Sequence, residues 1–546
     1  MINNTAEKPL NLTSDPQLLI DDYLVDDIWM IRRSPELPVK SLDNPIFQPG
    51  APFADASYGA TSVVYDEEQH LFRMWYSLAS ENANSLAYAI SEDGLHWEMP
   101  DLGLVEYKGS RNNNLCLGLD QGGGSVLIDP HDSDPERRYK MLHKRPWKQG
   151  TEGRVAISFS PDGLHWTPHF KDWKKSVRPR SNDGVNIALF DAKLGKYVLF
   201  CRPNMLAANQ ELDPRDIGFP PGWVREKDFA DPIAEANIAK EAGDGKKGKP
   251  KKELGFPTED DFVQHREAED YMHRYLKVPQ YVHTQALRLY KHVGGCNRRV
   301  ARAESDDFID WTIPEVVIRP DELDPPRLYN LNGVGLYKGL YIGALQLYHS
   351  WGFRNFPGCL QESETLDLHL TFSRDGKSWE RLANRPTFLP RGLIGAFDGG
   401  NIFTSSPPLV EFGDEIRIYY SGQQHSHLVP GGGCGIGVAR LPKERLVARV
   451  AGDEMGAMLT KPFVMQGERL EINADAREGL VKVEIADVMG AAIPGFGAQE
   501  AVEIRKDGFR LPVQWQHKSS VQALRGKTVR LRFYMLNTRL YSFCLS

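Results

Sequence analysis

Hydrophobic residues between positions 18 and 440 fall into short groups of four to seven that are separated by polar turns. Groups of this kind lie at 60–65, 71–77, 85–90, 125–128, 138–143, 154–157, 186–190 and 196–200. Many are rich in Val, Ile, Phe, Tyr and Trp, and several alternate between apolar and polar positions. Short groups of this composition predict β-strands, because amphipathic helices need longer stretches with a 3.6-residue period. The pattern therefore predicts an all-β protein made of repeated antiparallel strands.

A seven-residue motif recurs at the ends of these strand groups. Ser91-Glu-Asp-Gly-Leu-His-Trp97 returns as Ser160-Pro-Asp-Gly-Leu-His-Trp166 and as Ser373-Arg-Asp-Gly-Lys-Ser-Trp379, and Ser305-Asp-Asp-Phe-Ile-Asp-Trp311 is a degenerate copy. The four serines are 69, 145 and 68 residues apart, so the period is about 70 with one gap of double length. Asp-Gly favours a hairpin turn, because glycine adopts positive φ and the aspartate bonds the turn backbone. A β-rich repeat of this length is typical of propeller blades, in which the motif has a structural role.

The spacing of the motif divides the chain into five blades and one insertion. Residues 18–25 are expected to form a leading strand that closes the ring by pairing with the last blade. The third blade is interrupted by residues 203–297, which account for the gap of double length. Within this insertion, the lysine-rich stretch 243–252 predicts a solvated linker, and residues 259–278 favour one helix.

The pattern changes after about residue 461. Short alternating strands without the motif follow at 469–473, 480–485, 501–504, 513–515 and 528–534. Such strands, spaced by roughly ten residues, predict a β-sandwich. The predicted fold is therefore all-β: a five-bladed β-propeller over residues 1–455, with a partly helical insertion at 203–297 in the third blade, followed by a C-terminal β-sandwich over residues 456–546.

Charge and composition argue against several classes of protein. The net charge of −7 and the pI near 6.1 disfavour a nucleic-acid binder. No apolar stretch reaches the roughly 18 residues that a membrane span needs, so no membrane partner is expected. Residues 1–17 are polar and lack the apolar segment of a secretory signal, so the expected location is the cytoplasm, while a signal removed earlier stays open. The six cysteines are scattered without a Cys-x-x-Cys pair, which favours buried free thiols over disulfides or zinc.

The blades, the trailing sandwich and the Ser-x-Asp-Gly-x-x-Trp turns together resemble the five-bladed propeller glycoside hydrolases of families 32, 43, 68, 117 and 130. Leu19-Ile-Asp-Asp-Tyr-Leu24 and Trp97-Glu-Met-Pro-Asp-Leu-Gly-Leu104 are similar to stretches in proteins labelled family 32-like. The resemblance implies a carbohydrate-active enzyme. Family 32 itself has Trp-x-Asn-Asp-Pro-Asn-Gly, Arg-Asp-Pro and Glu-Cys as catalytic motifs, and this chain has none of them. The candidate residues therefore follow from position within the blades.

Carboxylates gather where a ligand at the propeller axis would meet the innermost strand of each blade. The aspartates that precede these strands are Asp55, Asp120, Asp183 and Asp398, and the fourth blade has Asn330 and Asn332 instead. Glycoside hydrolysis needs two carboxyl groups, one protonated and one ionised, and crowded like charges raise one pKa. We interpret Asp55 as base or nucleophile, partly by analogy with the resembled families, Asp183 as stabiliser, and Asp398 or Glu364 as acid. The alternative for each loop aspartate is a turn cap.

The loops between the second and third strands of the blades add candidate substrate contacts. Together with the axial positions, the predicted binding residues are Asp120, Arg145, Arg154, Arg299, Asn330, His349, Trp351, Asp367 and His425. Arginines suit an acidic group or phosphate, although inter-blade ion pairs explain each of them equally well. His425-Ser-His427 lacks a partner carboxylate motif, which favours a structural or sugar-contacting role over a metal site.

The sequence therefore predicts a glycosidase that acts on a terminal sugar, a furanoside among the candidates, in a funnel at the propeller axis. The insertion is expected to wall this funnel and to favour exo action or a small substrate. No metal or cofactor is expected, the expected partner is a carbohydrate, and a homo-oligomer is left open. Two alternatives remain: a glycoside phosphorylase with one acid and an arginine-lined phosphate site, and a carbohydrate-binding propeller without catalysis.

Overall fold

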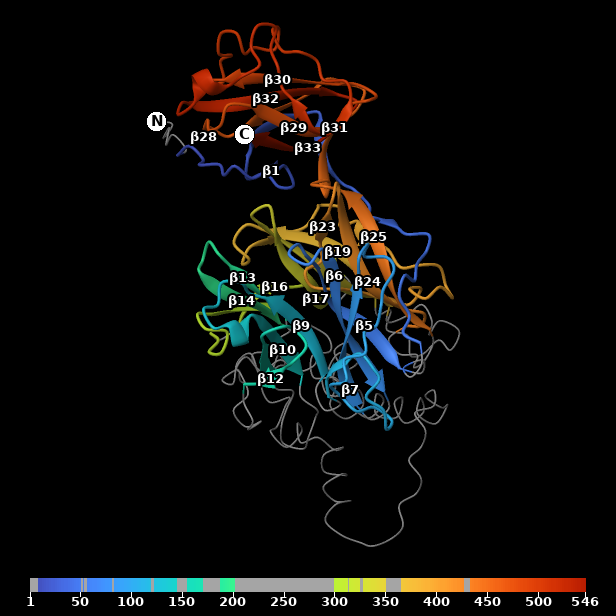
Figure 1. The fold of residues 1–546 in the computed structure, drawn as a ribbon. Coiled ribbons are helices and arrows are strands. Elements are labelled where there is room, and N and C mark those ends of the chain that lie inside the picture. The colour runs from blue at the N-terminus through green and yellow to red at the C-terminus, as the bar shows by residue number, and fades with distance from the viewer. Residues whose placement is uncertain are drawn as a thin grey trace, which may run out of the picture.

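The computed structural model describes residues 8–50, 53, 56–80, 83–118, 122–144, 155–169, 187–201, 299–312, 314–324, 328–349, 365–426 and 433–546 (Figure 1). The regular secondary structure of this described part is almost entirely β-strand, which confirms the all-β prediction. Its helical elements are two 3-10 turns, η1 (Pro135–Arg137) and η6 (Gln522–Leu524). The described part contains no helix that is long and apolar enough to cross a membrane. The predicted insertion 203–297, with its predicted helix, lies outside the described residues.

Three antiparallel sheets have four strands each, in chain order. The first is β5 (Ser57–Asp66), β6 (Leu71–Ser80), β7 (Ala83–Ser91) and β8 (Leu115–Leu117). The second is β9 (Gly122–Ile128), β10 (Tyr139–Lys144), β11 (Val155–Ser160) and β12 (Thr167–Pro168). The third is β13 (Ile187–Asp191), β14 (Lys196–Cys201), β15 (Val300–Ser305) and β16 (Glu315–Ile318). In each sheet the repeated motif follows the third strand, as the turn chemistry predicts.

A ten-stranded sheet follows and divides into two antiparallel groups. The first group is β17 (Leu328–Tyr337), β18 (Leu340–His349) and β19 (Thr365–Ser373), with β20 (Trp379–Glu380) and β21 (Thr387–Leu389) beside β19. The second is β22 (Asn401–Thr404), β23 (Val410–Phe412), β24 (Glu415–Gln423), β25 (Cys434–Pro442) and β4 (Val39–Lys40). The strand pairing between the two groups, among the described residues, is one short parallel contact between Leu366 and Asn401, so each group resembles one of the smaller sheets.

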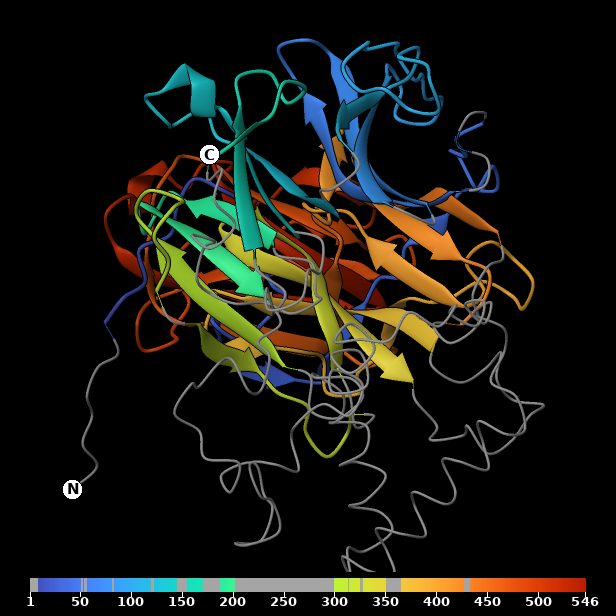
Figure 2. The same cartoon turned by 90° about the horizontal axis from the view of Figure 1, so that it is seen from below.

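The first strands of these groups form a closed circuit. Among the described strands, β5 contacts β9, β9 contacts β13, β13 contacts β17, β17 contacts β22, and β22 returns to β5. Viewed from below, the sheets follow one another in chain order around a common centre (Figure 2). Burial supports this arrangement, because separate hydrophobic clusters fill the spaces between successive sheets.

The circuit is closed by β4 and not by the predicted segment 18–25. Lys40 pairs with Ala439 and Val39 with Arg440, so the N-terminal segment completes the sheet that ends in β25. The expectation for residues 18–25 was therefore wrong. β1 (Gln17–Leu18) pairs with β33 and β2 (Val25–Trp29) pairs with β27, both near the C-terminus. The physical reason is burial, because Leu19 and Leu24 belong to the C-terminal hydrophobic core.

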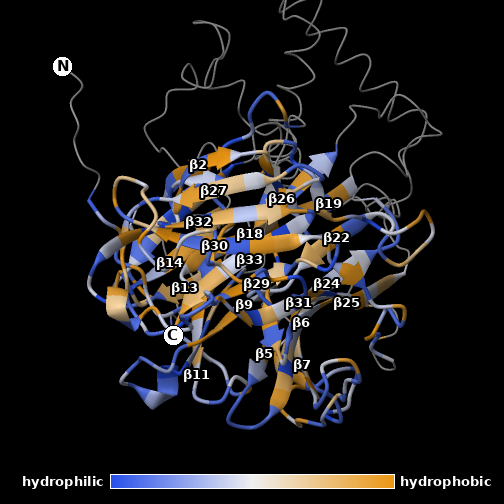
Figure 3. Cartoon of the chain, turned by 90° about the horizontal axis from the view of Figure 1, so that it is seen from above, coloured by the Kyte–Doolittle hydropathy of each residue, from blue (hydrophilic) through white to orange (hydrophobic). Residues whose placement is uncertain are grey.

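Two C-terminal sheets pack around that one core. Their remaining strands are β3 (Ile31–Pro35), β26 (Val447–Ala451), β27 (Gly456–Thr460), β28 (Phe463–Val464), β29 (Leu470–Asp475), β30 (Leu480–Ala486), β31 (Asp507–Pro512), β32 (Thr528–Leu536) and β33 (Thr538–Leu545). Buried positions alternate along β32, as its sequence pattern predicts. Figure 3 shows these sheets from above. Strand pairing also places residues 17–35 and 447–451 in these two C-terminal sheets. The predicted domain boundary between residues 455 and 456 stays a prediction.

The repeated turn is built by side chains that bond its own backbone. In the second copy, Ser160 Oγ accepts the N–H of Gly163 at 2.9 Å, and Asp162 Oδ1 accepts the N–H groups of Leu164 and His165 at 2.8 and 2.9 Å. Gly163 has φ 80°, a left-handed conformation that glycine adopts without strain. The copies at Ser91, Ser305 and Ser373 repeat the bonds from the aspartate.

The turns at Gly163 and Gly94 also fit against the second strand of the preceding sheet. Trp75 Nε1 on β6 donates to Gly163 O at 2.7 Å, and Arg73 donates to Asp162 O at 2.6 Å. A Cβ at Gly163 would lie 2.7 Å from the Trp75 ring, so close packing as well as φ demands glycine. Tyr419 on β24 donates to Gly94 O at 3.1 Å in the same way. The motif therefore joins one sheet to the next.

A fifth turn of this kind lacks all the motif residues. It follows β25, and Glu444 has φ 65° at the position that glycine occupies in the motif. The Glu444 N–H donates to the hydroxyl of Tyr337 on β17 at 3.1 Å. Leu441, which replaces the motif serine, lies 68 residues after Ser373, so the repeat period continues to the last sheet.

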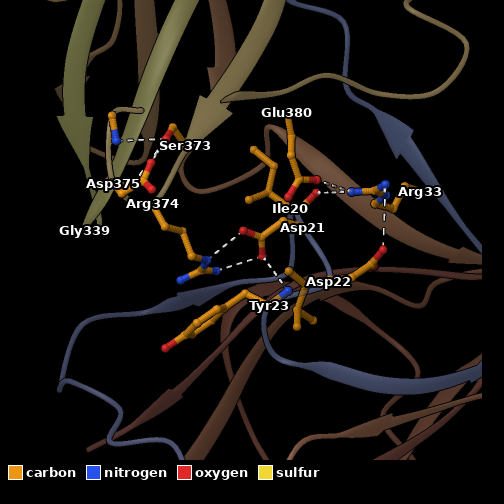
Figure 4. A network of polar contacts seen from close by, with 12 residues as sticks. Ile20, Asp21, Asp22, Tyr23, Arg33, Gly339, Ser373, Arg374, Asp375 and Glu380 are labelled. Carbon is orange, nitrogen blue, oxygen red and sulfur yellow. Dashed lines mark hydrogen bonds and ion pairs between the residues drawn. The ribbon is translucent and has the colours of Figure 1, made fainter. Parts of the chain in front are cut away.

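The motif turns lie on the side of the molecule that the C-terminal sheets cover. Arg374, inside the third motif, donates to both carboxylate oxygens of Asp21 at 2.7 and 2.8 Å and lies 4.0 Å from the Tyr23 ring centroid (Figure 4). Arg33 forms a second ion pair with Glu380 at 3.5 Å. Asp21 and Tyr23 belong to the N-terminal segment that pairs with the C-terminal strands. The opposite end of the strand circuit is therefore the side where a ligand was predicted.

Replacement of Phe308 by glycine tests which force decides the degenerate turn. Phe308 has φ 67°, and its relief by glycine is worth about 1–2 kcal/mol. The side chain is fully buried between Phe159, Tyr197 and Trp311, and its loss costs about 3–5 kcal/mol. We expect Phe308→Gly to lower the free energy of unfolding by about 2–3 kcal/mol in denaturant titrations. Unchanged or higher stability would show that backbone strain dominates.

The turn aspartates predict a loss of stability in acid. Burial is the largest single effect and raises their pKa, but hydrogen bonds from turn N–H groups and side chains together outweigh it, so the pKa values of Asp93, Asp162, Asp307 and Asp375 lie below the ordinary value. Groups with a lowered folded-state pKa stabilise the protein above the unfolded pKa of about 3.9, and this contribution is lost as pH falls through the folded value. Thermal unfolding midpoints should therefore fall steeply below about pH 4.

Asp162→Ala should lower the free energy of unfolding by about 1 kcal/mol at neutral pH. The thermal unfolding midpoint of this variant should also fall less steeply in acid than that of the parent protein. The matched control is Asp134→Ala, because Asp134 caps only the exposed turn η1. Equal stability of Asp162→Ala and the parent protein at pH 7 would refute this account of the turn.

Candidate functional site

Six of the predicted site residues lie within the described part of the chain: Arg299, Asn330, His349, Asp367, Asp398 and His425. The others lie outside the described residues: Asp55, Asp120, Arg145, Arg154, Asp183, Trp351 and Glu364. Their roles stay predictions. The six described residues come from β15 and from the ten-stranded sheet, at or near the strand ends opposite the motif turns.

Amide side chains satisfy the free edge of the innermost strand β22. Gln346 on β18 donates from Nε2 to Ile402 O at 2.5 Å, and Asn332 on β17 donates to Thr404 O at 2.8 Å. These bonds replace a strand neighbour, because a buried carbonyl needs a donor. They fix the contact between the two halves of the ten-stranded sheet.

Four amide side chains in this region have buried polar atoms without hydrogen-bond partners in the described part of the structure. These atoms are Asn330 Nδ2, Asn332 Oδ1, Gln346 Oε1 and Asn401 Oδ1, and we call their residues the amide cluster. Asn330 pairs with Gln346 across β17 and β18, and Asn401 begins β22. The four residues are at most 4% exposed. Buried polar atoms nearly always have partners, so this cluster suits a polar ligand or ordered water.

A second polar group lies on β18 and β19. His349 Nε2 is 2.9 Å from Asp367 Oδ1, and His369 Nε2 is 3.5 Å from the same oxygen. Burial raises the pKa of Asp367, but the contacts with His349 and His369 outweigh it and hold that pKa well below its usual range. Asp367 is therefore ionised at neutral pH.

The structure brings together two of the predicted binding residues, His349 and Asp367. It adds His369, which the sequence analysis missed. The signal was present, because Asp367-Leu-His369 alternates on a strand and places both side chains on one face.

Asp398 is enclosed by groups of its own chain. Its Oδ2 accepts from Lys40 Nζ at 2.6 Å and from Tyr420 Oη at 3.1 Å, and the residue is 3% exposed. A Cβ at Gly392 would lie 2.0 Å from Oδ1, so the backbone approaches the second oxygen closely. Because Lys40 lies on β4, the ion pair fastens the strand that closes the circuit.

Arg299 and His425 lie at the same end of the molecule. Arg299 directly precedes β15, and burial together with the nearby Arg319 lowers its pKa. His425 follows β24, and its carbonyl accepts from Asn401 Nδ2 at 3.0 Å. No group of three or more His, Cys, Asp or Glu residues in the described part of the chain could hold a metal ion.

Comparisons with known proteins give a limited match in sequence. The sequence matches no known family model. Two uncharacterized proteins of Mycobacterium tuberculosis are each 28% identical over 141 residues, which is 24% of this chain and 42% of each relative. The chain therefore matches less than half the length of these curated relatives.

Solved structures of carbohydrate-active enzymes match over most of their length. One is named for the GH130 family of mannoside phosphorylases and for glycoside hydrolases that target β-1,2 mannosidic linkages in Candida mannan (13% identity, 79% of this chain, 98% of that chain, TM-score 0.39). A glycosyl hydrolase from Bacteroides ovatus has 14% identity, 79% and 98% coverage, and a TM-score of 0.40. A thermostable family-43 glycoside hydrolase has 10% identity, 72% and 90% coverage, and a TM-score of 0.37. Families 43 and 130 are among those that the sequence resembles.

Variants at the Lys40–Asp398 pair distinguish an anchor from a catalytic residue. Lys40→Met leaves a buried carboxylate without its cation and should lower the free energy of unfolding by about 2 kcal/mol. The double variant Lys40→Met, Asp398→Asn should recover part of this loss, because no unpaired charge remains. Thermal and denaturant unfolding measure both effects. A catalytic Asp398 gives the opposite pattern: Asp398→Asn keeps or raises stability, as crowded like charges are relieved, and cuts turnover at least about a hundredfold.

Proposed function

We propose that the sheets form a five-bladed β-propeller that is joined to a C-terminal β-sandwich. The closed circuit β5–β9–β13–β17–β22 supports five blades, because each strand begins one antiparallel group. The turn at Glu444 supports the same count, since it continues the repeat into the last group. The N-terminal segment 17–35 then belongs to the sandwich, and β4 closes the propeller.

We infer that the protein is a glycoside hydrolase that acts on a terminal sugar at the end of the propeller axis away from the sandwich. The observation that carries this proposal is the amide cluster. Its unpaired atoms include both a donor, Asn330 Nδ2, and acceptors, Gln346 Oε1 and Asn401 Oδ1. Sugar hydroxyls donate and accept at once, so they satisfy such a mixed neutral set. A charged ligand would need a compensating charge there.

The carboxyl groups of the proposed reaction come from the predicted set. Asp55 acts as base or nucleophile and Asp183 stabilises the charge that develops, as the sequence analysis proposes. For the acid, the Lys40–Asp398 pair favours Glu364, because both Lys40 and Tyr420 already bond Asp398. The acid protonates the leaving oxygen, while the second carboxylate attacks or activates water. A wall formed by the insertion would restrict the enzyme to chain ends or small substrates.

A phosphorylase is the second candidate, and Arg299 is the observation that favours it. Arg299 and Arg319 are close enough for the second guanidinium to lower the pKa of the first. Two arginines of this kind are stabilised by an anion, and phosphate accepts from guanidinium in a bidentate manner. In this case phosphate, and not water, receives the sugar.

A substrate panel with and without phosphate tests these proposals. Aryl glycosides, fructans, galactans and arabinans are incubated with the protein, and released sugar and sugar phosphate are measured separately. Glu364→Gln should lower the turnover of natural substrates at least about a hundredfold. The turnover of aryl glycosides with good leaving groups should fall much less, because their leaving group departs without protonation by an acid. Glu362→Gln is the matched control in the same loop and should keep activity.

Three results contradict parts of this proposal. Full turnover by Glu364→Gln would remove Glu364 as the acid. Product formed only with phosphate, and lost in Arg299→Gln, would replace hydrolysis by phosphorolysis. Sugar binding without any product across the panel would leave a carbohydrate-binding propeller without catalysis.

A further inference from the structure

One face of the β18–β19 pair carries four polar side chains in a row. His349 pairs with Thr365 across the two strands, and Leu345 pairs with His369. Thr365, Asp367 and His369 alternate along β19, so their side chains share a face, and His349 reaches that face from β18. We call these four residues the β18–β19 polar site. The apolar residues Leu345 and Leu347 lie between them on β18 and belong to the adjoining core.

This site has more hydrogen-bonding capacity than the described residues use. Thr365 is fully buried and its Oγ1 has no partner among them, and neither ring nitrogen of His369 makes a regular hydrogen bond there. Asp367 Oδ1 has the two imidazole contacts but no bond of regular geometry. His369 is 6% exposed, so bulk water does not compensate. Unpaired atoms on the buried Thr365 and His369, beside the partly exposed His349–Asp367 pair, indicate a missing polar occupant.

Other His–Asp pairs in this chain show what a structural pair looks like. His96 and His165 contact Asp93 and Asp162 at 2.7 Å, but these histidines are exposed. Their aspartates also accept backbone N–H groups and so build a turn. The β18–β19 polar site differs, because Thr365 and His369 are buried and their side-chain atoms are unpaired among the described residues.

We propose that His349, Thr365, Asp367 and His369 bind two neighbouring hydroxyl groups of a sugar. The proposal rests on the proposed function for the class of ligand. One hydroxyl donates to the Asp367 carboxylate and accepts from an imidazole N–H, and its neighbour exchanges hydrogen bonds with Thr365 and the second imidazole. Hydroxyls suit this mixture of donors and acceptors. The Asp367 carboxylate disfavours a phosphate or carboxylate ligand, because like charges repel.

The site therefore determines specificity. A sugar with both hydroxyls makes every bond, whereas a deoxy analogue leaves a buried polar group unpaired and binds at least about tenfold more weakly. This discrimination separates the β18–β19 polar site from the amide cluster, which contributes neutral contacts only.

Histidine ring resonances of the full-length protein, labelled at Cε1, test the proposal directly. D-mannose, D-galactose, D-fructose and L-arabinose are titrated singly, and D-glucosamine and glucose 6-phosphate serve as charged probes. We expect at least one neutral sugar to shift the His349 and His369 resonances and to leave that of His96 unchanged. Asp367→Asn and His369→Gln should each weaken the binding of this sugar at least about tenfold, and the matched control His96→Gln should leave its affinity unchanged.

The outcomes separate this proposal from the proposed function. The β18–β19 polar site is refuted if no neutral sugar moves the His369 resonance, or if only glucosamine or the phosphate does. It is also refuted if a substrate is hydrolysed with the same KM by Asp367→Asn and His369→Gln, and the hydrolase then stands. Shifts at His369 without hydrolysis of any substrate support the site and refute the hydrolase. Because the titration uses the parent protein, a variant that fails to fold does not affect it.

Discussion

A left-handed residue at the turn after the third strand of each sheet is the constraint on which the propeller depends. At this turn the chain reverses, and in the copies at Gly94 and Gly163 its backbone lies against the second strand of the preceding sheet. Gly163 shows both demands, since its φ is 80° and a Cβ would lie 2.7 Å from the Trp75 ring. Phe308 and Glu444 meet the same demand without glycine, and each is compensated: Phe308 is buried among aromatic rings, and Glu444 forms ion pairs with Arg510 at 2.7 and 3.1 Å. Inter-sheet packing therefore selects the turn geometry, and residue type follows from what each turn contacts.

This constraint also divides the two ends of the molecule by role. The motif turns carry the polar network of Arg374 and Asp21, which joins them to the C-terminal sheets. The opposite end holds the starts of the innermost strands, whose edges have no strand neighbour. The amides of Gln346 and Asn332 fill that need for Ile402 O and Thr404 O, and their oxygens are two of the four unpaired atoms of the amide cluster. The unpaired oxygens of these amides are thus a consequence of the hydrogen bonds that the edge of β22 needs.

The sequence was sufficient for local turns and insufficient for partners that lie far away in the chain. Spacing of the Ser-x-Asp-Gly motif predicted the strand groups, because each turn is determined by bonds within seven residues. The fifth turn escaped detection, since Glu444 has neither the serine, the aspartate nor the glycine. Residues 18–25 were predicted as one strand, but residues 19–24 are not strand, and the sequence pattern does not say which core receives Leu19 and Leu24. Asp398 looked like an axial acid because its partner Lys40 is 358 residues away. His369 was overlooked although its alternation with Asp367 was visible.

Asp398 and Asp367 together show how a carboxylate's surroundings decide its role. Both lie toward the same end of the ten-stranded sheet, and both contact nitrogen within 3 Å. An ammonium and a phenol bond Asp398 Oδ2, and the backbone at Gly392 lies close to Oδ1, so groups of its own chain surround this carboxylate. Two imidazoles meet one oxygen of Asp367, and each imidazole has a second nitrogen that needs its own partner. A carboxylate that is saturated by its own chain stabilises a fold, whereas one beside unpaired donors and acceptors is ready to bind a ligand. By this criterion we expect Asp398 to hold β4 in place, and we propose Asp367 as a ligand-binding residue.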